Sequence, residues 1–216
     1  HSSFNMEGGK ISNCGANSFG GGVYNGGTFT MNGGEITSCS AQQGGGVYNA
    51  GTFTMNGGKI TGCNGSDHSG ALFIHVNAVF TMNDGEISDC FAGNGGGVYI
   101  YTANGAGGTF IMNGGKITNC WANNGGSGNG GGAVFVNANG RFEMYDGEIS
   151  GCSSPGSNSR GGGVHLHSNA VFTMSGGKIT NCWGNAVRGG GVYVDWGSFT
   201  MSGGEISGCS GTNGGG

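Results

Sequence analysis

The sequence predicts an all-β fold: one right-handed parallel β-helix (a β-solenoid) of eight coils, each with three short strands and no helix cap. Three observations support this prediction. The pattern F-x-M-x-x-G-x-I-x-x-C occurs eight times without an insertion. Its apolar residues begin two apart, which is the spacing along one face of a strand. Glycine supplies 56 of the 216 residues but recurs at fixed places in the repeat, as it would not in a disordered glycine-rich chain.

The second coil illustrates the order of the elements. Phe29 and Met31 share the inner face of the first strand, because alternate side chains of a strand point the same way. Gly34 lies where a corner needs a positive φ or a backbone without a side chain. Ile36 begins the second strand, and Val47, which follows a run of glycines, begins the third. Successive phenylalanines are 24–32 residues apart, and all of this variation falls in the loops that flank the third strand.

A single coil cannot bury its apolar side, so the coils must stack and share one core. Crossover connections between parallel strands are right-handed in about 98% of cases, which predicts a right-handed helix. Residues 1–216 are therefore expected to form one domain, either a segment of a longer solenoid or a filament subunit. Its expected partners are further coils of the same chain or copies of itself, placed end to end.

The residue before each isoleucine forms a predicted charge ladder on the outer surface. Its sign alternates without exception: Lys10, Glu35, Lys59, Glu86, Lys116, Glu148, Lys178 and Glu205. Stacked coils would place opposite charges about 5 Å apart, where each exposed pair contributes only ~0.2–1 kcal/mol. A slip of one coil would set like charges against each other, so the ladder is expected to specify register.

Cysteine occupies one position in every repeat, three residues after isoleucine: Cys14, Cys39, Cys63, Cys90, Cys120, Cys152, Cys182 and Cys209. Three interpretations are open. The thiols could serve as small apolar core groups. Disulfides between neighbouring coils are a second interpretation, because a Cα separation near 4.8 Å is within the permitted range. Metal binding is the third, although no Cys-x-x-Cys spacing is present.

An aromatic stripe is predicted on the outside of the third strand, with further aromatic residues nearby. These residues form the candidate binding surface: Tyr24, Tyr48, Phe73, Tyr99, Tyr101, Phe135, His165, Tyr193, Trp121 and Trp183. Aromatic columns stabilise stacked strands by themselves. The alternative is a docking surface for glycan rings or for a neighbouring rod, and glycan partners would make the chain a carbohydrate-binding module.

Several function classes are not expected. A net charge of −4 with only seven Lys and Arg argues against nucleic-acid binding. The sequence has no run of eighteen apolar residues, so membrane insertion is not expected. No catalytic motif is present, and the charges outside the ladder are scattered, so neither an enzyme such as a polysaccharide lyase or hydrolase nor a cofactor, catalytic or metal site is expected. Paired threonines such as Thr28 and Thr30 resemble the threonine rows of ice-binding proteins. Arg141 and Glu143 interrupt the row, so the threonines are better explained by their preference for β-strands.

The segment F-T-M-N-G-G-x-I followed by G-G-G-V-Y resembles the repeats of bacterial polymorphic outer-membrane and adhesin-like surface proteins. Their fold is similar to that of the pectate-lyase-like right-handed β-helices. The resemblance covers the whole chain and implies an extracellular or cell-surface location. The expected function is therefore structural or adhesive, as a stiff stalk or filament.

Overall fold

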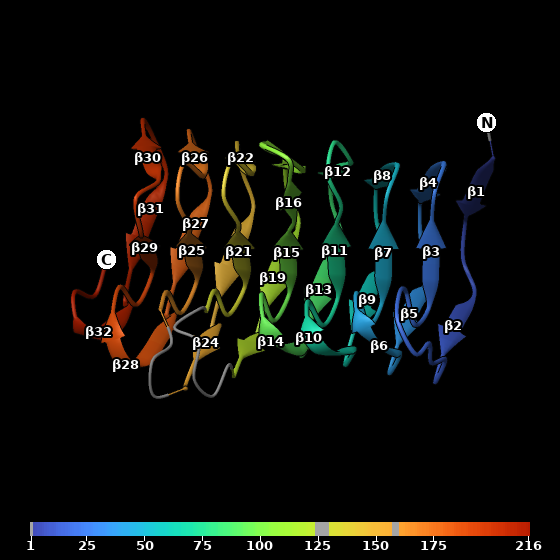
Figure 1. The fold of residues 1–216 in the computed structure, drawn as a ribbon, viewed down its shortest axis with the longest axis horizontal. Helices are drawn as coiled ribbons and strands as arrows, with labels where there is room; N and C mark the ends of the chain where they lie inside the picture. The colour runs from blue at the N-terminus through green and yellow to red at the C-terminus, as the bar shows by residue number, and fades with distance from the viewer. Residues whose placement is uncertain (1, 124–129, 157–159) are drawn as a thin grey trace.

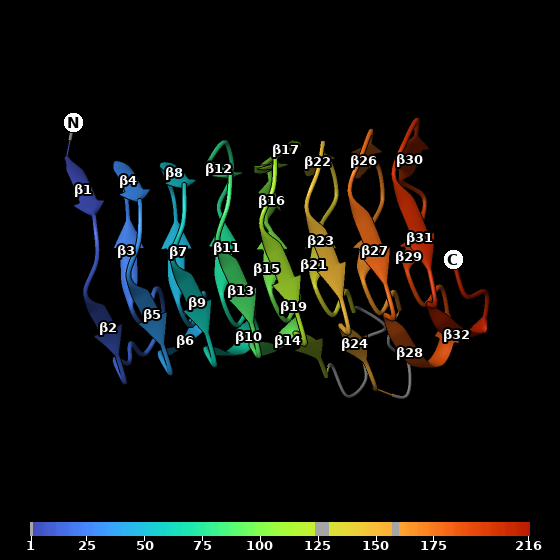
Figure 2. The ribbon, with the colours of Figure 1, turned by 180° about the vertical axis from the view of Figure 1, so that it is seen from behind.

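The computed structural model describes residues 2–123, 130–156 and 160–216. Over these residues the chain is all β-structure without a helix, and its coils stack side by side from the N-terminal to the C-terminal end (Figure 1; Figure 2). The predicted parallel β-solenoid is confirmed. Among the described residues, no helix is long and apolar enough to cross a membrane.

The first two sheets contain one strand from every coil. The first sheet contains β1 (Ser3–Met6), β4 (Thr28–Met31), β8 (Thr52–Met55), β12 (Val79–Met82), β18 (Thr109–Met112), β22 (Arg141–Met144), β26 (Val171–Met174) and β30 (Ser198–Met201). The second sheet contains β2 (Lys10–Ser12), β5 (Glu35–Thr37), β9 (Lys59–Thr61), β13 (Glu86–Ser88), β19 (Lys116–Thr118), β23 (Glu148–Ser150), β27 (Lys178–Thr180) and β31 (Glu205–Ser207).

Two further sheets have seven strands each. The third sheet, after the cysteine, contains β6 (Ser40–Gln43), β10 (Asn64–His68), β14 (Phe91–Asn94), β20 (Trp121–Ala122), β24 (Ser153–Ser154), β28 (Trp183–Arg188) and β32 (Ser210–Asn213). The fourth sheet, after the glycine run, contains β3 (Val23–Asn25), β7 (Val47–Asn49), β11 (Leu72–Ile74), β15 (Val98–Ile100), β21 (Val134–Val136), β25 (Val164–Leu166) and β29 (Val192–Val194). A small antiparallel hairpin, β16 (Thr102–Ala103) with β17 (Ala106–Gly107), extends one loop.

The predicted strands are present, and most coils add a fourth strand in the segment after the cysteine. Its inward residues are small: Ala41, Ala92 and Ala122 are buried, and Ser154 takes the same place in a later coil. A strand whose buried face is lined by small residues has no alternation of large apolar side chains to announce it. In the first coil this sheet is reduced to two isolated bridges, and the last coil has no strand in the fourth sheet, so the described residues make about seven turns.

Neighbouring coils pair in register, so each type of side chain forms a column through the core. Phe29 pairs with Phe53 and Met31 with Met55, and the same match recurs in every pair of adjacent strands of the first sheet. Adjacent phenylalanine rings are stacked with centroids 4.5–4.9 Å apart. Columns of methionine, isoleucine, cysteine and valine fill the rest of one continuous core.

The glycine two before isoleucine is required for two reasons. Gly115 has φ +79°, which side chains with a Cβ rarely adopt, and a Cβ added there would lie 2.6 Å from Met82 Cε of the preceding coil. Gly34 repeats both features, with φ +84° and a distance of 2.7 Å to Met6 Cε. The methionine methyl of one coil thus packs against the glycine corner of the next. The predicted role of this glycine is confirmed.

A second column of left-handed residues lies immediately before the cysteines. Asn13, Ser38, Asp89 and Asn119 have φ between 53° and 54°, and Gly62 at the same position has φ 61°. Asparagine, aspartate and glycine are the residues that adopt this conformation most easily. This left-handed residue forms the corner that turns the chain from the second sheet into the third. Its positive φ explains why only small and polar residues occupy the position.

Candidate functional surfaces

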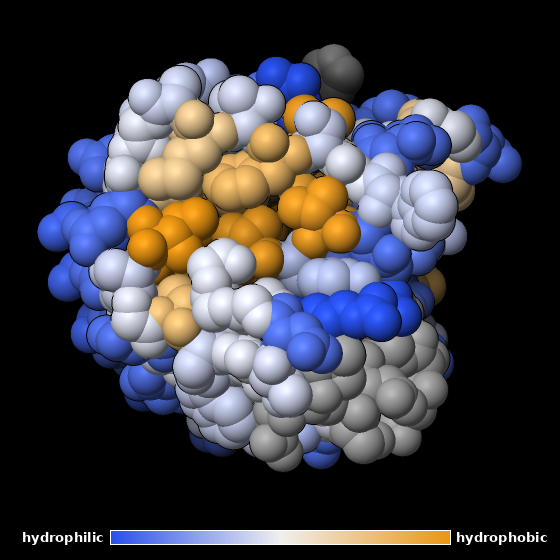
Figure 3. All heavy atoms as spheres, turned by 90° about the vertical axis from the view of Figure 1, so that its left-hand side faces the viewer, coloured by the Kyte–Doolittle hydropathy of each residue, from blue (hydrophilic) through white to orange (hydrophobic). Residues whose placement is uncertain are grey.

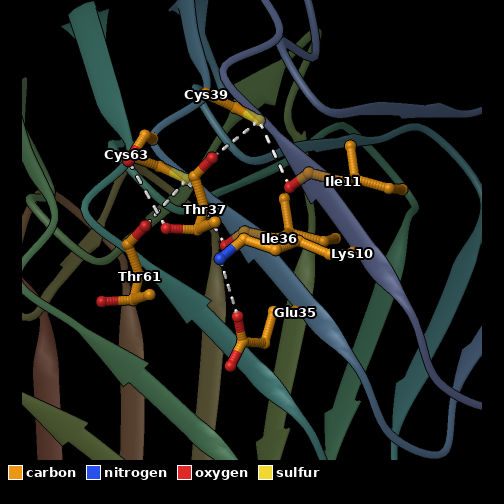
Figure 4. A network of polar contacts seen from close by, with 9 residues as sticks. Lys10, Ile11, Glu35, Ile36, Thr37, Cys39, Thr61 and Cys63 are labelled. Carbon is orange, nitrogen blue, oxygen red and sulfur yellow. Dashed lines mark hydrogen bonds and ion pairs between the residues drawn. The ribbon is translucent and has the colours of Figure 1, made fainter.

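The charge ladder lies on the outer face of the second sheet, as predicted. Backbone pairing sets Lys10 beside Glu35 and continues through the remaining rungs to Glu205. Figure 4 shows the ion pair between Lys10 and Glu35. Its Nζ–Oε2 distance is 3.2 Å. The distances are 3.2 Å for Lys59 with Glu86 and 4.0 Å for Lys116 with Glu148. In these pairs each lysine bonds the glutamate of the following coil.

The cysteine ladder runs inside the corner between the second and third sheets. All eight cysteines are free, and six are buried, while Cys14 is exposed and Cys209 is half-buried. Each thiol donates to the carbonyl two residues earlier, as Cys39 does to Thr37 O at 3.4 Å and Cys63 to Thr61 O at 3.5 Å (Figure 4). A second acceptor is the isoleucine carbonyl of the preceding coil, 3.9 Å from Cys39 Sγ at Ile11 O. These bonds fit protonated thiols that act as small core groups.

The electrostatics favour the thiol form at most positions of the ladder, whereas hydrogen bonds with the thiols of Cys152 and Cys209 lower the pKa of Cys182. Burial raises the pKa of Cys120 and Cys152 well above the usual value of a thiol. For Cys63 and Cys90 the first cause of the raised pKa is the hydrogen bond to the thiol of the next coil, followed by burial for Cys63. The thiolate is the reactive form of cysteine, so these four side chains are poor nucleophiles. Among the described residues, no group of three His, Cys, Asp or Glu side chains could hold a metal ion.

The aromatic stripe forms the expected stacked column on the outer side of the fourth sheet, but most of its rings are buried and do not form an open docking surface. Ring centroids of successive members are 4.8–5.4 Å apart from Tyr24 to Tyr193. The buried members are Tyr48, Phe73, Tyr99, Phe135 and His165. Tyr24 at one end is 59% exposed, and Tyr193 and Tyr101 are half-buried.

Side chains from the flanking loops and from the end of β10 cover this column. The ring of Phe19 lies 4.7 Å from that of Tyr48, and His68 stacks on Tyr99 at 4.4 Å. Tyr101 lies against Phe73 at 5.4 Å. The result is a second, smaller hydrophobic cluster outside the main core. Burial raises the pKa of Tyr48 to about 12, which agrees with a ring that has left water.

The two tryptophans of the candidate surface belong to a different sheet. Trp121 is in β20 and stacks on Phe91 at 4.7 Å, whereas Trp183 is in β28 and is 42% exposed. Ser153 lies between them in the pairing of the third sheet. The ten residues predicted as one binding surface are therefore divided between two sheets, and they do not form a single platform for a sugar ring.

The polar end of the aromatic column contains a buried histidine. Neither ring nitrogen of His165 has a hydrogen-bond partner, and burial, followed by the charge of Arg160 and then His167, lowers its pKa to about 3. Arg160 bonds Asp195 at 2.7 Å and lies over the Tyr193 ring, 5.6 Å from its centroid. The imidazole of His165 is therefore neutral at pH 7 and serves as a packing ring between its neighbours in the column.

The outer face of the first sheet is not a uniform threonine surface. Arg141 and Glu143 form an ion pair in the middle of it, and the other carboxylate oxygen of Glu143 accepts a hydrogen bond from Tyr145. The regular spacing needed to match an ice lattice is therefore broken at β22, where the sequence predicted it.

The two end faces expose the columns that are buried elsewhere. At the C-terminal end Met201 is 43% exposed, Phe199 and Ile206 are half-buried, and Figure 3 shows apolar side chains gathered at the centre of this face. At the other end Phe4 is 43% exposed and Ile11 is half-buried. Each end thus presents phenylalanine and isoleucine at the same places in the coil.

The fold and its surfaces define a class: a parallel β-solenoid in which columns of identical side chains run through every coil. Comparison with protein-family models, with curated proteins and with solved structures gives no match. The resemblance of the repeats to bacterial surface proteins remains an expectation from the motif.

Proposed function

We propose that this chain is a structural β-solenoid that acts as a stiff stalk or filament element at the cell surface or outside the cell. The observation that carries the proposal is the unbroken register of the columns: every coil pairs in phase with the next in the first and second sheets from one end to the other. The surface location rests on the resemblance of the repeats.

Stiffness follows from how the coils are joined. Successive coils share backbone hydrogen bonds in up to four sheets and a column of stacked rings, so bending would open several rows of contacts together. In a solenoid each coil contacts only its neighbours, and the rigidity of the whole depends on the weakest junction. The third sheet is the thinnest part, since β20 and β24 have only two residues each.

Extension of the rod requires only that a neighbouring coil repeats the columns. The exposed Met201 and the half-buried Phe199 and Ile206 would meet a methionine, a phenylalanine and an isoleucine of a following coil, as the same residue types do at every junction within the chain. The charges would also continue, because the ladder begins with Lys10 and ends with Glu205. The neighbour is either a further coil of the same polypeptide or another copy stacked head to tail.

A carbohydrate-binding module is less well supported. Glycan docking on aromatic rings needs open ring faces, and the faces of Tyr48, Phe73 and Tyr99 are covered by neighbouring coils and loops.

Negative-stain microscopy of the purified chain tests the proposal. We expect straight rods, with lengths that exceed one chain when copies stack end to end. A variant with Phe4→Asp and Met201→Asp places charges on both end faces and should yield only single-chain rods. Flexible or globular particles would refute the stiff element. A chain that stays monomeric, from a natural polypeptide without further coils, would refute extension.

A further inference from the structure

The charged side chains on the outer face of the second sheet form ion pairs within the chain but remain partly exposed to solvent. The ion pairs join Lys10 to Glu35, Lys59 to Glu86 and Lys116 to Glu148, each between neighbouring coils. Their side chains keep between 35% and 63% of their surface exposed. The ladder is therefore a narrow row of alternating charges that a second surface can reach.

The order of signs in this row is its own complement when it is reversed. The eight charges alternate in sign, and the row begins with lysine and ends with glutamate. If one copy of the row is reversed and placed against a second copy, every lysine therefore faces a glutamate. The facing rungs are Lys10 with Glu205, Glu35 with Lys178, Lys59 with Glu148, and Glu86 with Lys116. A two-fold axis perpendicular to the rod, between the fourth and fifth coils, produces this arrangement and keeps the two ladders face to face.

Parallel alignment does not have this property. A two-fold axis along the rod places each coil opposite its own copy, so that lysine would face lysine and glutamate would face glutamate. Like charges in contact across an interface are unfavourable and exclude that arrangement. An isologous antiparallel pair is thus the symmetric arrangement that the ladder favours.

Two additional carboxylates strengthen the match. Asp84 and Asp146 replace the first glycine of the corner, and both lie in coils whose ladder residue is glutamate. Each lines a shallow groove, of about 390 Å³ beside Glu86 and about 400 Å³ beside Glu148. In the antiparallel pair the coils that face these two grooves are those of Lys116 and Lys59. Each groove is also lined by two lysines of its own chain, Lys59 and Lys116 beside Glu86 and Lys116 and Lys178 beside Glu148, and a lysine of the second copy would add a contact to the two carboxylates.

We infer that the outer face of the second sheet is an interface at which two copies of this chain associate side by side, with their rods antiparallel. This association is lateral, so it is independent of the end-to-end extension proposed above. The contact is narrow and made of exposed ion pairs, which are individually weak and screened by salt. The dimer is accordingly a low-affinity one that forms at low ionic strength.

A charge-swap series tests the interface by sedimentation equilibrium at low ionic strength. Glu86→Lys or Lys116→Glu alone makes two contacts across the axis repulsive, and each should weaken association at least about tenfold. The double variant restores both contacts across the axis and should recover most of the association. Asp67→Lys changes the net charge as Glu86→Lys does, but on the exposed third sheet, and should have no effect on association.

The series separates association from folding. Each single variant creates two like-charge neighbours within the ladder, and the double variant also creates two, namely at positions 59 with 86 and 116 with 148. The melting temperature should therefore stay lowered in the double variant while association returns. Recovery of both together, or of neither, would overturn the inference.

Zero-length carbodiimide cross-linking tests the antiparallel register. Glu35 and Lys178 lie five coils apart in one chain, about 24 Å at 4.8 Å per coil, but face each other in the antiparallel pair. We expect a Glu35–Lys178 cross-link in the dimer band, found by mass spectrometry and suppressed in 0.5 M salt. Cross-links between copies at Lys10 and Glu205 without Glu35–Lys178 would indicate head-to-tail stacking and refute the lateral dimer. A chain that remains monomeric at low salt and millimolar concentration would also refute it.

Discussion

Raising the pH should unfold this protein through its cysteine column. Cys63, Cys90, Cys120 and Cys152 have pKa values raised well above that of a free thiol, because of hydrogen bonds between neighbouring thiols and burial. In the unfolded chain the same thiols ionise at pH 8.5–9, so the unfolded state then binds fewer protons than the native state. Stability is thus complete below the unfolded pKa and is lost as the pH rises above it.

The size of the loss follows from the four thiols. Each contributes about 1 kcal/mol between pH 9 and pH 10, and the raised pKa values of Cys39 and Cys209 act in the same direction, so the free energy of unfolding should fall by at least about 4 kcal/mol over that unit. Single domains are stable by roughly 5–15 kcal/mol, so the loss is a large part of the total.

Urea unfolding followed by circular dichroism, in reductant at pH 7, 8, 9 and 10, measures this loss. The double variant Cys90→Ala with Cys120→Ala should lose about 2 kcal/mol less than the parent between pH 9 and pH 10, although it is less stable at pH 7. Cys14→Ala removes an exposed thiol and should leave the pH dependence unchanged. A free energy of unfolding that is constant from pH 8 to pH 10, or that falls equally in the double variant, would refute the burial of protonated thiols.

Four further predictions concern the columns and the ladder. An aromatic disulfide reagent should react with few thiols of the native protein and with all eight in denaturant, whereas two or fewer in denaturant without reductant would indicate disulfides. Glu86→Lys should lower the melting temperature at low salt, with much of the loss recovered in high salt; an unchanged melting temperature at low salt would show that the ladder does not contribute. Gly115→Ala should destabilise by about 2 kcal/mol or more, since its Cβ would lie 2.6 Å from Met82 Cε at a positive φ, and a neutral result in denaturant unfolding would contradict the packing described. The pKa of His165 is lowered to about 3, so its contribution to the free energy of unfolding is complete above the unfolded pKa near 6.5. As the pH falls from there towards 3, the free energy of unfolding should decrease by about 1.4 kcal/mol per pH unit. His165→Phe should remove that decrease in acid unfolding curves.

Most of the core could be predicted because its residues repeat. The spacing of Phe29, Met31, Ile36 and Cys39 recurs in every coil, and a repeat of fixed spacing has only one way to stack in phase. The third sheet could not be predicted, because small inward residues such as Ala41 leave no apolar pattern.

The exposure of the aromatic stripe could not be predicted either. Alternation along a strand places Tyr48 and Phe73 outside the main core, and the structure agrees. They are buried by Phe19 and Tyr101 from loops of variable length and by His68 at the end of β10. The repeat pattern contains no information about where those loops fold, so sequence spacing separates inner from outer faces but does not separate exposed outer faces from covered ones.

The charge ladder also limits how such a chain can grow by gene duplication. The columns of phenylalanine, methionine, glycine and cysteine repeat in every coil, so the core by itself would accept one duplicated coil. Copying the coil of Glu86 alone would set two glutamates side by side, whereas copying it together with the coil of Lys116 keeps the signs alternating. The smallest duplication that preserves both the core columns and the alternating charges is therefore a pair of coils. Related chains, and arrays engineered from this one, should lengthen in steps of two coils, or about 10 Å.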